Sequence, residues 1–248
     1  MTAGTVLRTA MFPLGLIFVW WVVVPIAGVP DRYLPGLGEI VVNAVAVAPE
    51  LAAAVGRTGL EAFLGFTLAA VTGVIWGTLF AKVPVLERSV LPLFVALQTI
   101  PVVAFGAIVV IWFGNTLLAK VFISYFLAFF PISVNTLQGL RAVNPQRVDL
   151  FRSFGASRLK TYRSVELPAA LPNIVVGLKT GVSLALVGAI VGEWFGDTVG
   201  LGVMLLQALY FEDVLRTWVL IIATGLLGGT FYSLLAYCEK KLVWWRGE

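Results

Sequence analysis

The 248-residue sequence contains no histidine and only one cysteine, Cys238. Without histidine, the chain cannot form a Ser-His or Cys-His nucleophilic site, a histidine-containing zinc site or a histidine proton relay. A single cysteine cannot form an internal disulfide. A phosphate-binding loop of the pattern G-x-x-x-x-G-K-[ST] is also absent. We therefore expect no catalytic residues, no metal site and no cofactor in this chain.

Charged residues are scarce as well, at 12% of the sequence, whereas hydrophobic residues make up 60% and the mean hydropathy is +0.98. A soluble domain of this size exposes too much surface to be covered by so few charges. The apolar runs are continuous over about 20 residues, which favours helices that cross a bilayer over the alternating strands of a barrel. The expected fold class is therefore all-α, a polytopic membrane protein.

Six hydrophobic stretches are long enough to cross about 30 Å of hydrocarbon at 1.5 Å per residue. They cover residues 9–29, 59–81, 90–114, 117–140, 174–195 and 217–237. The first is longer than the apolar core of a signal peptide, so we expect an uncleaved anchor. Residues 31–56 are expected to form an external loop and a short interfacial helix. Pro92, Pro101 and Pro131 are expected to kink or interrupt the spans.

Lysine and arginine are distributed unevenly between the two sides that six spans would create. With a cytoplasmic N-terminus, 13 of the 17 basic residues fall on the cytoplasmic side, and only Arg32, Arg57, Lys120 and Arg216 fall outside. Basic residues are enriched in cytoplasmic loops, so both termini are expected in the cytoplasm. The net charge of +4 is explained by this topology, and we expect lipid rather than nucleic acid as its partner.

The segment 141–172 is the one long loop on the expected cytoplasmic side, with six basic and two acidic residues. Asn144 is placed to cap a short helix at its N-terminus, and Gly155 is placed to end that helix in the left-handed conformation. Ser157 is placed to cap a second short helix. The pattern favours a docking element for a partner protein, and an amphipathic hairpin on anionic lipid headgroups is the alternative. The second helix is expected to end at the prolines at 168 and 172.

The residues of this loop resemble a known motif. The run 149–155 (DLFRSFG) is followed after nine residues by 165–168 (VELP). It resembles the coupling-loop motif of bacterial ABC importer permeases, Glu-Ala-Ala, three residues, Gly, nine residues, Ile-x-Leu-Pro. Asp149 and Val165 are mild departures, whereas Leu150 and Phe151 replace the two alanines.

The resemblance extends over nearly the whole chain. It is carried by 34–35 (LP), 57–58 (RT), 65–66 (GF), 98–101 (QTIP), 112–114 (WFG), 191–194 (VGEW) and 200–202 (GLG). These motifs are similar to the permease group that serves nitrate, sulfonates, taurine and thiamine-pyrimidine precursors.

The resemblance implies a single transmembrane domain over residues 1–248, with a core at about 57–239 and a coupling loop at 141–172. It implies a bacterial inner-membrane protein that pairs with a second permease copy, with cytoplasmic ABC ATPase subunits that hold ATP and Mg²⁺, and with an extracytoplasmic solute-binding protein. Import would proceed by alternating access. The residues expected to contact the ATPase are Asp149, Leu150, Phe151, Arg152, Phe154, Gly155, Arg158, Leu167 and Pro168, with Phe151 and Phe154 as the anchors.

Ionisable and polar residues within spans are candidates for function. Glu193 lies near the outer end of the fifth span, where it either faces the solute pathway, extends to the interface or pairs with Arg216. Gln98, Thr99 and Asn135 are further candidates for the pathway, or they satisfy backbone groups that prolines leave free.

Two sets of residues in the spans have structural interpretations. Gly188, Gly192, Gly196 and Gly200 recur at four-residue spacing, which predicts close helix packing in the fifth span. Arg57 and Glu61 lie four residues apart on one helical face and are expected to form an ion pair.

Two other classes of function compete with this interpretation. An intramembrane aspartyl protease needs two buried aspartates, but Asp149, Asp197 and Asp213 fall in expected loops or at span ends. A channel or a secondary transporter without an ATPase partner is the second alternative, and it would not need the patterned loop. The solute is expected to be a thiamine-pyrimidine precursor, nitrate or a sulfonate.

Overall fold

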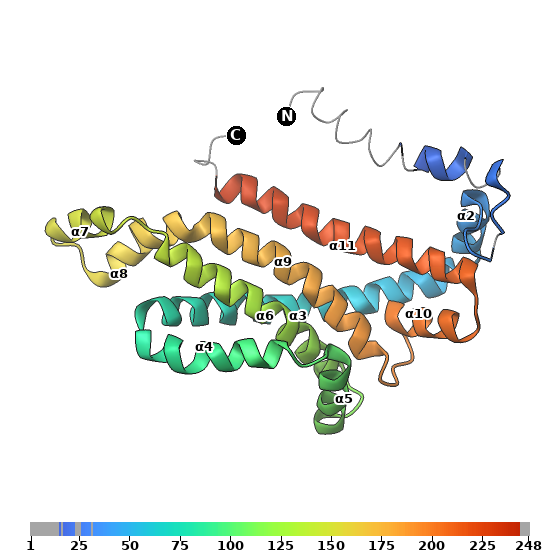
Figure 1. The fold of residues 1–248 in the computed structure, drawn as a ribbon, viewed down its shortest axis with the longest axis horizontal. Coiled ribbons are helices and arrows are strands. Elements are labelled where there is room, and N and C mark those ends of the chain that lie inside the picture. Colours follow the sequence, from blue (N-terminus) through green and yellow to red (C-terminus); the bar gives the residue numbers. More distant parts are fainter. Residues whose placement is uncertain (1–14, 16, 23–25, 31, 244–248) are drawn as a thin grey trace.

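The computed structural model describes residues 15, 17–22, 26–30 and 32–243, and this part of the chain contains helices and no strand (Figure 1). The elements in chain order are α2 (Leu37–Ala46), α3 (Ala48–Lys82), α4 (Pro84–Gln98), α5 (Val102–Phe113), α6 (Leu117–Arg141), α7 (Pro145–Ser153), α8 (Arg158–Thr161), the π-helical turn η1 (Tyr162–Glu166), α9 (Leu167–Glu193), α10 (Leu201–Tyr210) and α11 (Val214–Leu242). The all-α fold class is confirmed.

Four helical segments in the described part are long and apolar enough to cross a membrane: α3, α6, the continuous segment Arg158–Glu193, and α11. A fifth span is formed if α4 and α5, which meet at an angle of 101°, are counted together. These five correspond to the last five of the six expected spans. Of the first expected span, 9–29, residues 9–14, 16 and 23–25 lie outside the described residues, so this span is not tested as a whole.

The expected span 90–114 is broken in the middle. α4 ends at Gln98 and α5 begins at Val102, with Pro101 as the N-cap of α5. Proline has no N–H to donate to the preceding turn, which favours a break of the helix at Pro101. Pro92 and Pro131, by contrast, lie within the unbroken helices α4 and α6. The prediction of an interrupted span is confirmed at Pro101.

The second short helix of the loop was expected to end at Pro168 and Pro172, but it continues into the next span. α8 passes through η1 into α9 without a gap, and α9 begins at Leu167 rather than near residue 174. Pro168 directly follows the π-helical turn η1, at the start of α9. Pro172 is accommodated inside the helix. The prediction that these two prolines terminate a helix is therefore wrong.

α6 lies between α3 and α9 and forms the centre of the bundle. Ser124 of α6 is flanked by Gly65 of α3 and Gly188 of α9, and a Cβ on either glycine would meet it closer than van der Waals contact. Ile132 is likewise flanked by a glycine from each neighbouring helix. Small residues let helix backbones approach where lipid supplies no hydrophobic drive for association. The core therefore forms along the two faces of α6.

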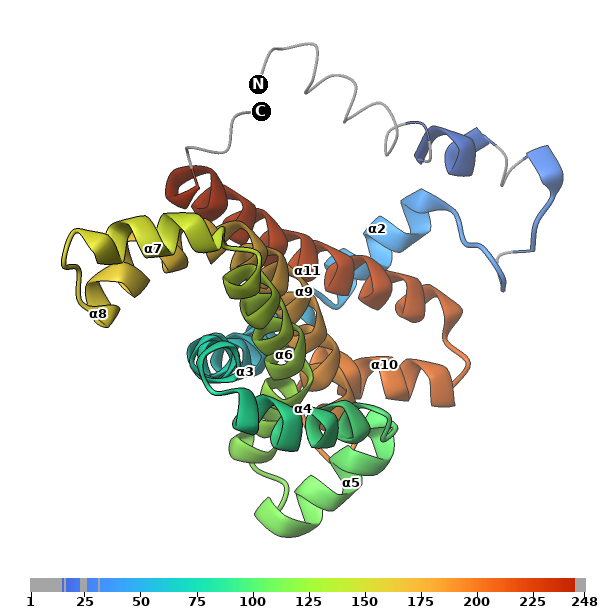
Figure 2. The same cartoon turned by 60° about the vertical axis from the view of Figure 1, so that its left-hand side comes forward.

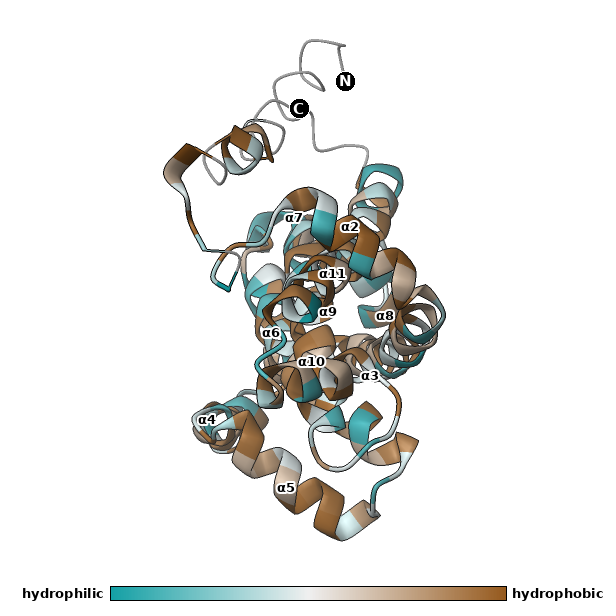
Figure 3. Cartoon of the chain, turned by 90° about the vertical axis from the view of Figure 1, so that its right-hand side faces the viewer, coloured by the Kyte–Doolittle hydropathy of each residue, from teal (hydrophilic) through white to brown (hydrophobic). Residues whose placement is uncertain are grey.

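The remaining helices surround this centre. Only 11% of the apolar window of α11 is buried, against 56% for the segment Arg158–Glu193. α11 exposes Ile221, Leu226 and Leu234. Figure 3 shows apolar residues over most of α5 as well. These faces suit lipid or another apolar surface rather than water.

The two ends of the bundle carry different elements. Figure 1 shows α7 and α8 beyond one end and α2 and α10 toward the other. In the turned view of Figure 2, α7 and α8 still project from the bundle. The loop expected on the cytoplasmic side and the loops expected outside thus lie at opposite ends.

Replacing Gly188 by alanine tests the close packing of α9 on α6. A Cβ at this position would lie 2.7 Å from Ser124 Cα, so we expect the unfolding temperature in detergent to fall by several degrees, for a cost of about 1–3 kcal/mol. Gly229→Ala in α11 is the matched control, since a Cβ there meets no atom of the described residues within 4 Å. Equal unfolding temperatures for both variants would contradict the packing.

Candidate functional site

The hairpin of α7 and α8 is held by capping interactions at both of its helices. Asn144 Oδ1 accepts a hydrogen bond from the N–H of Gln146 at 2.9 Å, and Ser157 Oγ accepts one from the N–H of Lys160 at 3.3 Å. Gly155 joins the helices with φ +78°, the left-handed conformation that favours glycine. These three cap predictions are confirmed. Capping stabilises helices that are too short to persist alone.

The hairpin exposes an apolar surface formed by Leu150, Phe154 and Leu159, which we call the hairpin patch. The exposed fractions of these residues are 60%, 80% and 58%. Phe151, one of the two expected anchors, is only half-buried rather than exposed. Leu159 belongs to the exposed patch although sequence reasoning did not count it among the contact residues.

The other expected contact residues of the loop differ in position. Asp149, Arg152, Gly155 and Arg158 lie on the exposed hairpin. Arg152 and Arg158 line a groove of about 500 Å³ between the hairpin and the end of α3. Leu167 instead packs against the buried cluster formed by Leu140, Ala170 and Ile174, and Pro168 follows it in the first turn of α9. These last two residues anchor the base of the hairpin rather than its surface.

Two side-chain contacts hold the hairpin to α3. The hydroxyl oxygens of Tyr162 and Thr78 lie 3.0 Å apart. Lys82 forms an ion pair with the buried Glu166. Both pairs join residues 84 positions apart, so no local sequence pattern reveals them. Movement of the hairpin is therefore linked to α3 as well as to α9.

Glu193 closes a buried hydrogen-bond network at the opposite end of the bundle. Its side chain is fully buried and accepts hydrogen bonds from Thr58 Oγ1 and from the N–H of Gly202, each at 2.6 Å. Thr58 Oγ1 in turn accepts the N–H of Leu201 at 2.9 Å. Through these contacts one carboxylate joins α3, α9 and α10.

Two of the expected roles of Glu193 are therefore wrong. It does not extend to the interface, because its carboxylate oxygens are held inside by Thr58 and Gly202. It does not pair with Arg216, whose Nη2 instead lies 2.6 Å from Glu50 Oε2. Arg57 Nε and Glu61 Oε1 lie 2.8 Å apart, so the expected ion pair on α3 is confirmed.

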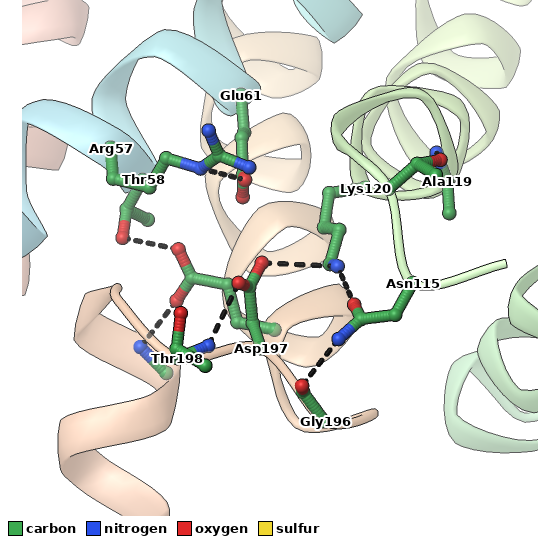
Figure 4. A network of polar contacts seen from close by, with 12 residues as sticks. Arg57, Thr58, Glu61, Asn115, Ala119, Lys120, Gly196, Asp197 and Thr198 are labelled. Atoms are coloured by element: carbon green, nitrogen blue, oxygen red, sulfur yellow. Dashed lines mark hydrogen bonds and ion pairs between the residues drawn. The ribbon is translucent and has the colours of Figure 1, made fainter.

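A second polar cluster lies beside the first (Figure 4). Lys120 is buried, and its Nζ lies 3.0 Å from Asp197 Oδ2 while also donating to the Asn115 side chain. Asn115 donates to the carbonyl of Gly196. Figure 4 shows Lys120 and Asn115 facing the loop that carries Asp197. Burial alone would raise the pKa of the Asp197 carboxyl, but the Lys120 ammonium and the Thr198 N–H hold that pKa below its ordinary value.

The four glycines predicted to form one packing stripe divide into two pairs. Gly188 and Gly192 lie on α9, where an added Cβ would meet α6 of the same chain at 2.7 Å and 3.2 Å. Gly196 and Gly200 lie beyond the end of α9 at Glu193, with φ +93° and +159°, so their assignment to helix packing is wrong. A Cβ on Gly200 would collide with the carboxylate of Glu193. Gly200 therefore leaves the space that this carboxylate occupies.

The residues expected along the pathway are not gathered in one place. Asn135 Nδ2 donates to the carbonyl of Pro131 at 2.8 Å, and Thr99 Oγ1 donates to that of Ala96 at 2.7 Å, so both satisfy backbone groups. Glu193 is buried in its network. Gln98, at the end of α4, is exposed, and its side chain makes no hydrogen bond to another described residue.

Gln98 lines a cavity of about 250 Å³ between α3, α4 and α6. Apart from Gln98 and Leu97, the lining consists of six aromatic residues: Trp76, Phe94, Tyr125, Phe126, Phe129 and Phe130. We call this space the aromatic cavity. The helical spacing of the four aromatics in 125–130 places them near one another, but no sequence pattern links them to Trp76 and Phe94 on other spans.

Comparison with known proteins gives both family and fold matches. Residues 69–244 match the family described as "Binding-protein-dependent transport system inner membrane component". The formylaminopyrimidine transport permease protein ThiX of Halalkalibacterium halodurans is 34% identical over 97% of this chain and 96% of its own length. The putative aliphatic sulfonates transport permease protein SsuC of Bacillus subtilis is 28% identical over 98% of this chain and 88% of its own length.

A solved structure shares the fold. A chain of the MetNI methionine ABC transporter in inward-facing conformations matches with a TM-score of 0.66 and 18% identity, over 82% of this chain and 99% of that one. At this identity the match concerns the fold alone.

Substitution of Glu193 tests the buried network. Leucine would leave the Gly202 N–H and the Thr58 hydroxyl without their acceptor, and we expect a loss of about 2–4 kcal/mol because each buried unsatisfied donor costs about 1–3 kcal/mol. Glu193→Gln keeps one acceptor oxygen and is expected to lose less. Thermal unfolding of the purified protein in detergent measures both. A leucine variant as stable as the glutamine variant would contradict the network.

Proposed function

The chain belongs to the family of binding-protein-dependent transport system inner membrane components, and on that premise we propose how it carries out import. As a member of this family it is the permease subunit of an ABC importer and a multi-pass protein of the inner membrane. We propose that separate cytoplasmic ATPase subunits hold ATP and Mg²⁺. Two copies of this chain form a homodimer around the pathway, and a binding protein delivers the solute from outside. Both termini lie in the cytoplasm.

The hairpin patch is the observation that carries this proposal. Phe154 is 80% exposed at the tip of a capped, glycine-linked hairpin. An aromatic side chain held this far from its own core has apolar surface for a partner to bury, and aromatic anchors in pockets dominate many interfaces. The exposed Arg152 and Arg158 supply charged contacts at its rim. We propose that the ATPase subunit receives the hairpin patch in a groove.

Coupling follows from the contacts that tie the hairpin to the bundle. The ion pair of Lys82 with Glu166 and the contact of Tyr162 with Thr78 connect it to α3. When ATP binding draws the ATPase subunits together, the two hairpins move with them and the helices rearrange from inward-open to outward-open. ATP drives this change only if the ATP-bound ATPase binds the outward-open permease more tightly than it binds the inward-open one.

The solute is best sought among the cargo of related permeases. The relative with 34% identity over nearly the whole chain is named for formylaminopyrimidine, which supports a thiamine-pyrimidine precursor. Nitrate and sulfonates are the alternatives. A channel or a secondary transporter would move solute without ATP, so the ATP dependence of uptake by the reconstituted complex separates that function from the proposed one.

Truncation of Phe154 tests the coupling surface. Because this side chain is 80% exposed, Phe154→Ala is expected to leave the unfolding temperature of the permease nearly unchanged. Recovery of the ATPase with the permease, and ATP-driven uptake into proteoliposomes, are both expected to fall at least tenfold, which is about 1.4 kcal/mol of binding.

Val85→Ala is the matched control for this truncation. Val85 is 73% exposed at the start of α4, on the same side of the protein but outside the hairpin. Its truncation is expected to change neither recovery nor uptake. Normal uptake and ATPase recovery with Phe154→Ala would refute the role of the hairpin patch.

A further inference from the structure

We propose that the aromatic cavity is a transit site for a small, uncharged heteroaromatic solute with a single ring. The inference rests on the proposed function, since a solute must cross this bundle for such a site to have a purpose. It adds the place of contact, the class of solute and the exclusion of nitrate and sulfonates. Four features of the cavity support it.

The first feature is the arrangement of the rings. Phe94 lies edge-on to Trp76, with ring centroids 5.8 Å apart, and edge-on to Phe129 at 5.3 Å. Tyr125 and Phe129 have centroids 5.6 Å apart. Rings at these angles present both faces and edges to the space between them, and a further flat ring entering that space gains offset-stacked or edge contacts.

The second feature is the polar content of the lining. The Gln98 amide offers two donors and an acceptor and has no hydrogen-bond partner among the described residues. It can pair in the plane of a ring that carries a nitrogen acceptor beside an amino donor. Within the described part of the chain, no lysine or arginine lines the cavity. An anion such as nitrate or a sulfonate would lose its hydration there without a cation to replace it.

The third feature is size. The cavity volume is about 250 Å³. A cavity of about 150 Å³ holds benzene, and pockets for drug-sized ligands begin at about 300 Å³. The volume therefore admits one substituted six-membered ring.

The fourth feature is the helix break beside the cavity. Gln98 is the last residue of α4, and the chain turns by 101° before α5. Non-helical backbone at membrane depth is tolerated only where it lies within protein or lines a water-filled space. Gln98 and Thr99 are both exposed at this break. The open side of the cavity therefore suits an aqueous pathway rather than lipid.

Quenching of Trp76 fluorescence in the purified permease–ATPase complex measures binding in the cavity. The probe is formylaminopyrimidine, with zwitterionic taurine and anionic nitrate as charged probes, and a Trp76→Phe complex identifies the signal that belongs to this residue. We expect saturable quenching by formylaminopyrimidine alone. Phe94→Leu, which removes a ring but keeps apolar volume, and Gln98→Leu, which removes the amide, are each expected to weaken affinity roughly tenfold.

Two substitutions on α6 serve as controls, one for the loss of a ring and one for the loss of an amide. Phe122→Leu removes a ring of α6 that does not line the cavity, and Gln138→Leu removes an exposed amide near the end of α6. Both are expected to leave the affinity unchanged. Basal ATP hydrolysis is expected to be equal in all variants, because none of these residues lies on the hairpin.

The outcomes separate this inference from the proposed function. If Phe94→Leu and Gln98→Leu leave ATP-driven uptake of the transported solute unchanged, the transit site is overturned while the permease function stands. Equal quenching by taurine or nitrate, or quenching that detergent or lipid displaces without saturation, would overturn it as well. Absence of ATP-driven uptake of every solute tested would instead overturn the proposed function.

Discussion

The fold depends on the close contact of α6 with α3 and α9, which glycines on α3 and α9 make possible. Ser124 of α6 lies between Gly65 of α3 and Gly188 of α9, and neither neighbour leaves room for a methyl group. In a bilayer, apolar surface alone gives little reason for helices to associate, so contact between backbones must supply the attraction. The direction of α6 is fixed by these contacts on both sides. The cavity on one flank of α6 and the polar clusters near its start are positioned by the same packing.

One group of charges is organised around the loop that follows α9. Glu193 and Asp197 lie four residues apart, yet they serve different partners: Glu193 holds Thr58 and Gly202, and Asp197 faces Lys120. Each charge that leaves water is thus met by donors or by an opposite charge, as low-dielectric surroundings demand. The glycines at 196 and 200 take backbone conformations that bring the loop over these carboxylates. Their four-residue spacing continues the helical stripe only by coincidence.

The parts of the fold that depend on local sequence were predictable. Hydrophobic length identified five spans that the described residues contain, and the caps at Asn144, Gly155 and Ser157 followed from residue types and spacing. The failures have a common cause. Pro172 is carried inside α9, and Glu193 is bound by Thr58, which is 135 positions away in sequence. Tertiary contacts of this kind leave no trace in a window of ten or twenty residues. The aromatic cavity could not be predicted from the sequence for the same reason, since its lining residues come from three spans.

The continuous helical segment from Arg158 to Glu193 has a mechanical consequence. Its 36 residues, at 1.5 Å per residue, make a rod of about 54 Å that begins at the hairpin and ends at the buried carboxylate on the far side. Axial force applied at one end arrives at the other without passing through a loop. The π-helical turn at Tyr162–Glu166 is the segment where the hydrogen-bond ladder is widened, and such turns are frequent at functional sites. Twisting at that turn would let the hairpin reorient on its partner while the rod itself keeps its length.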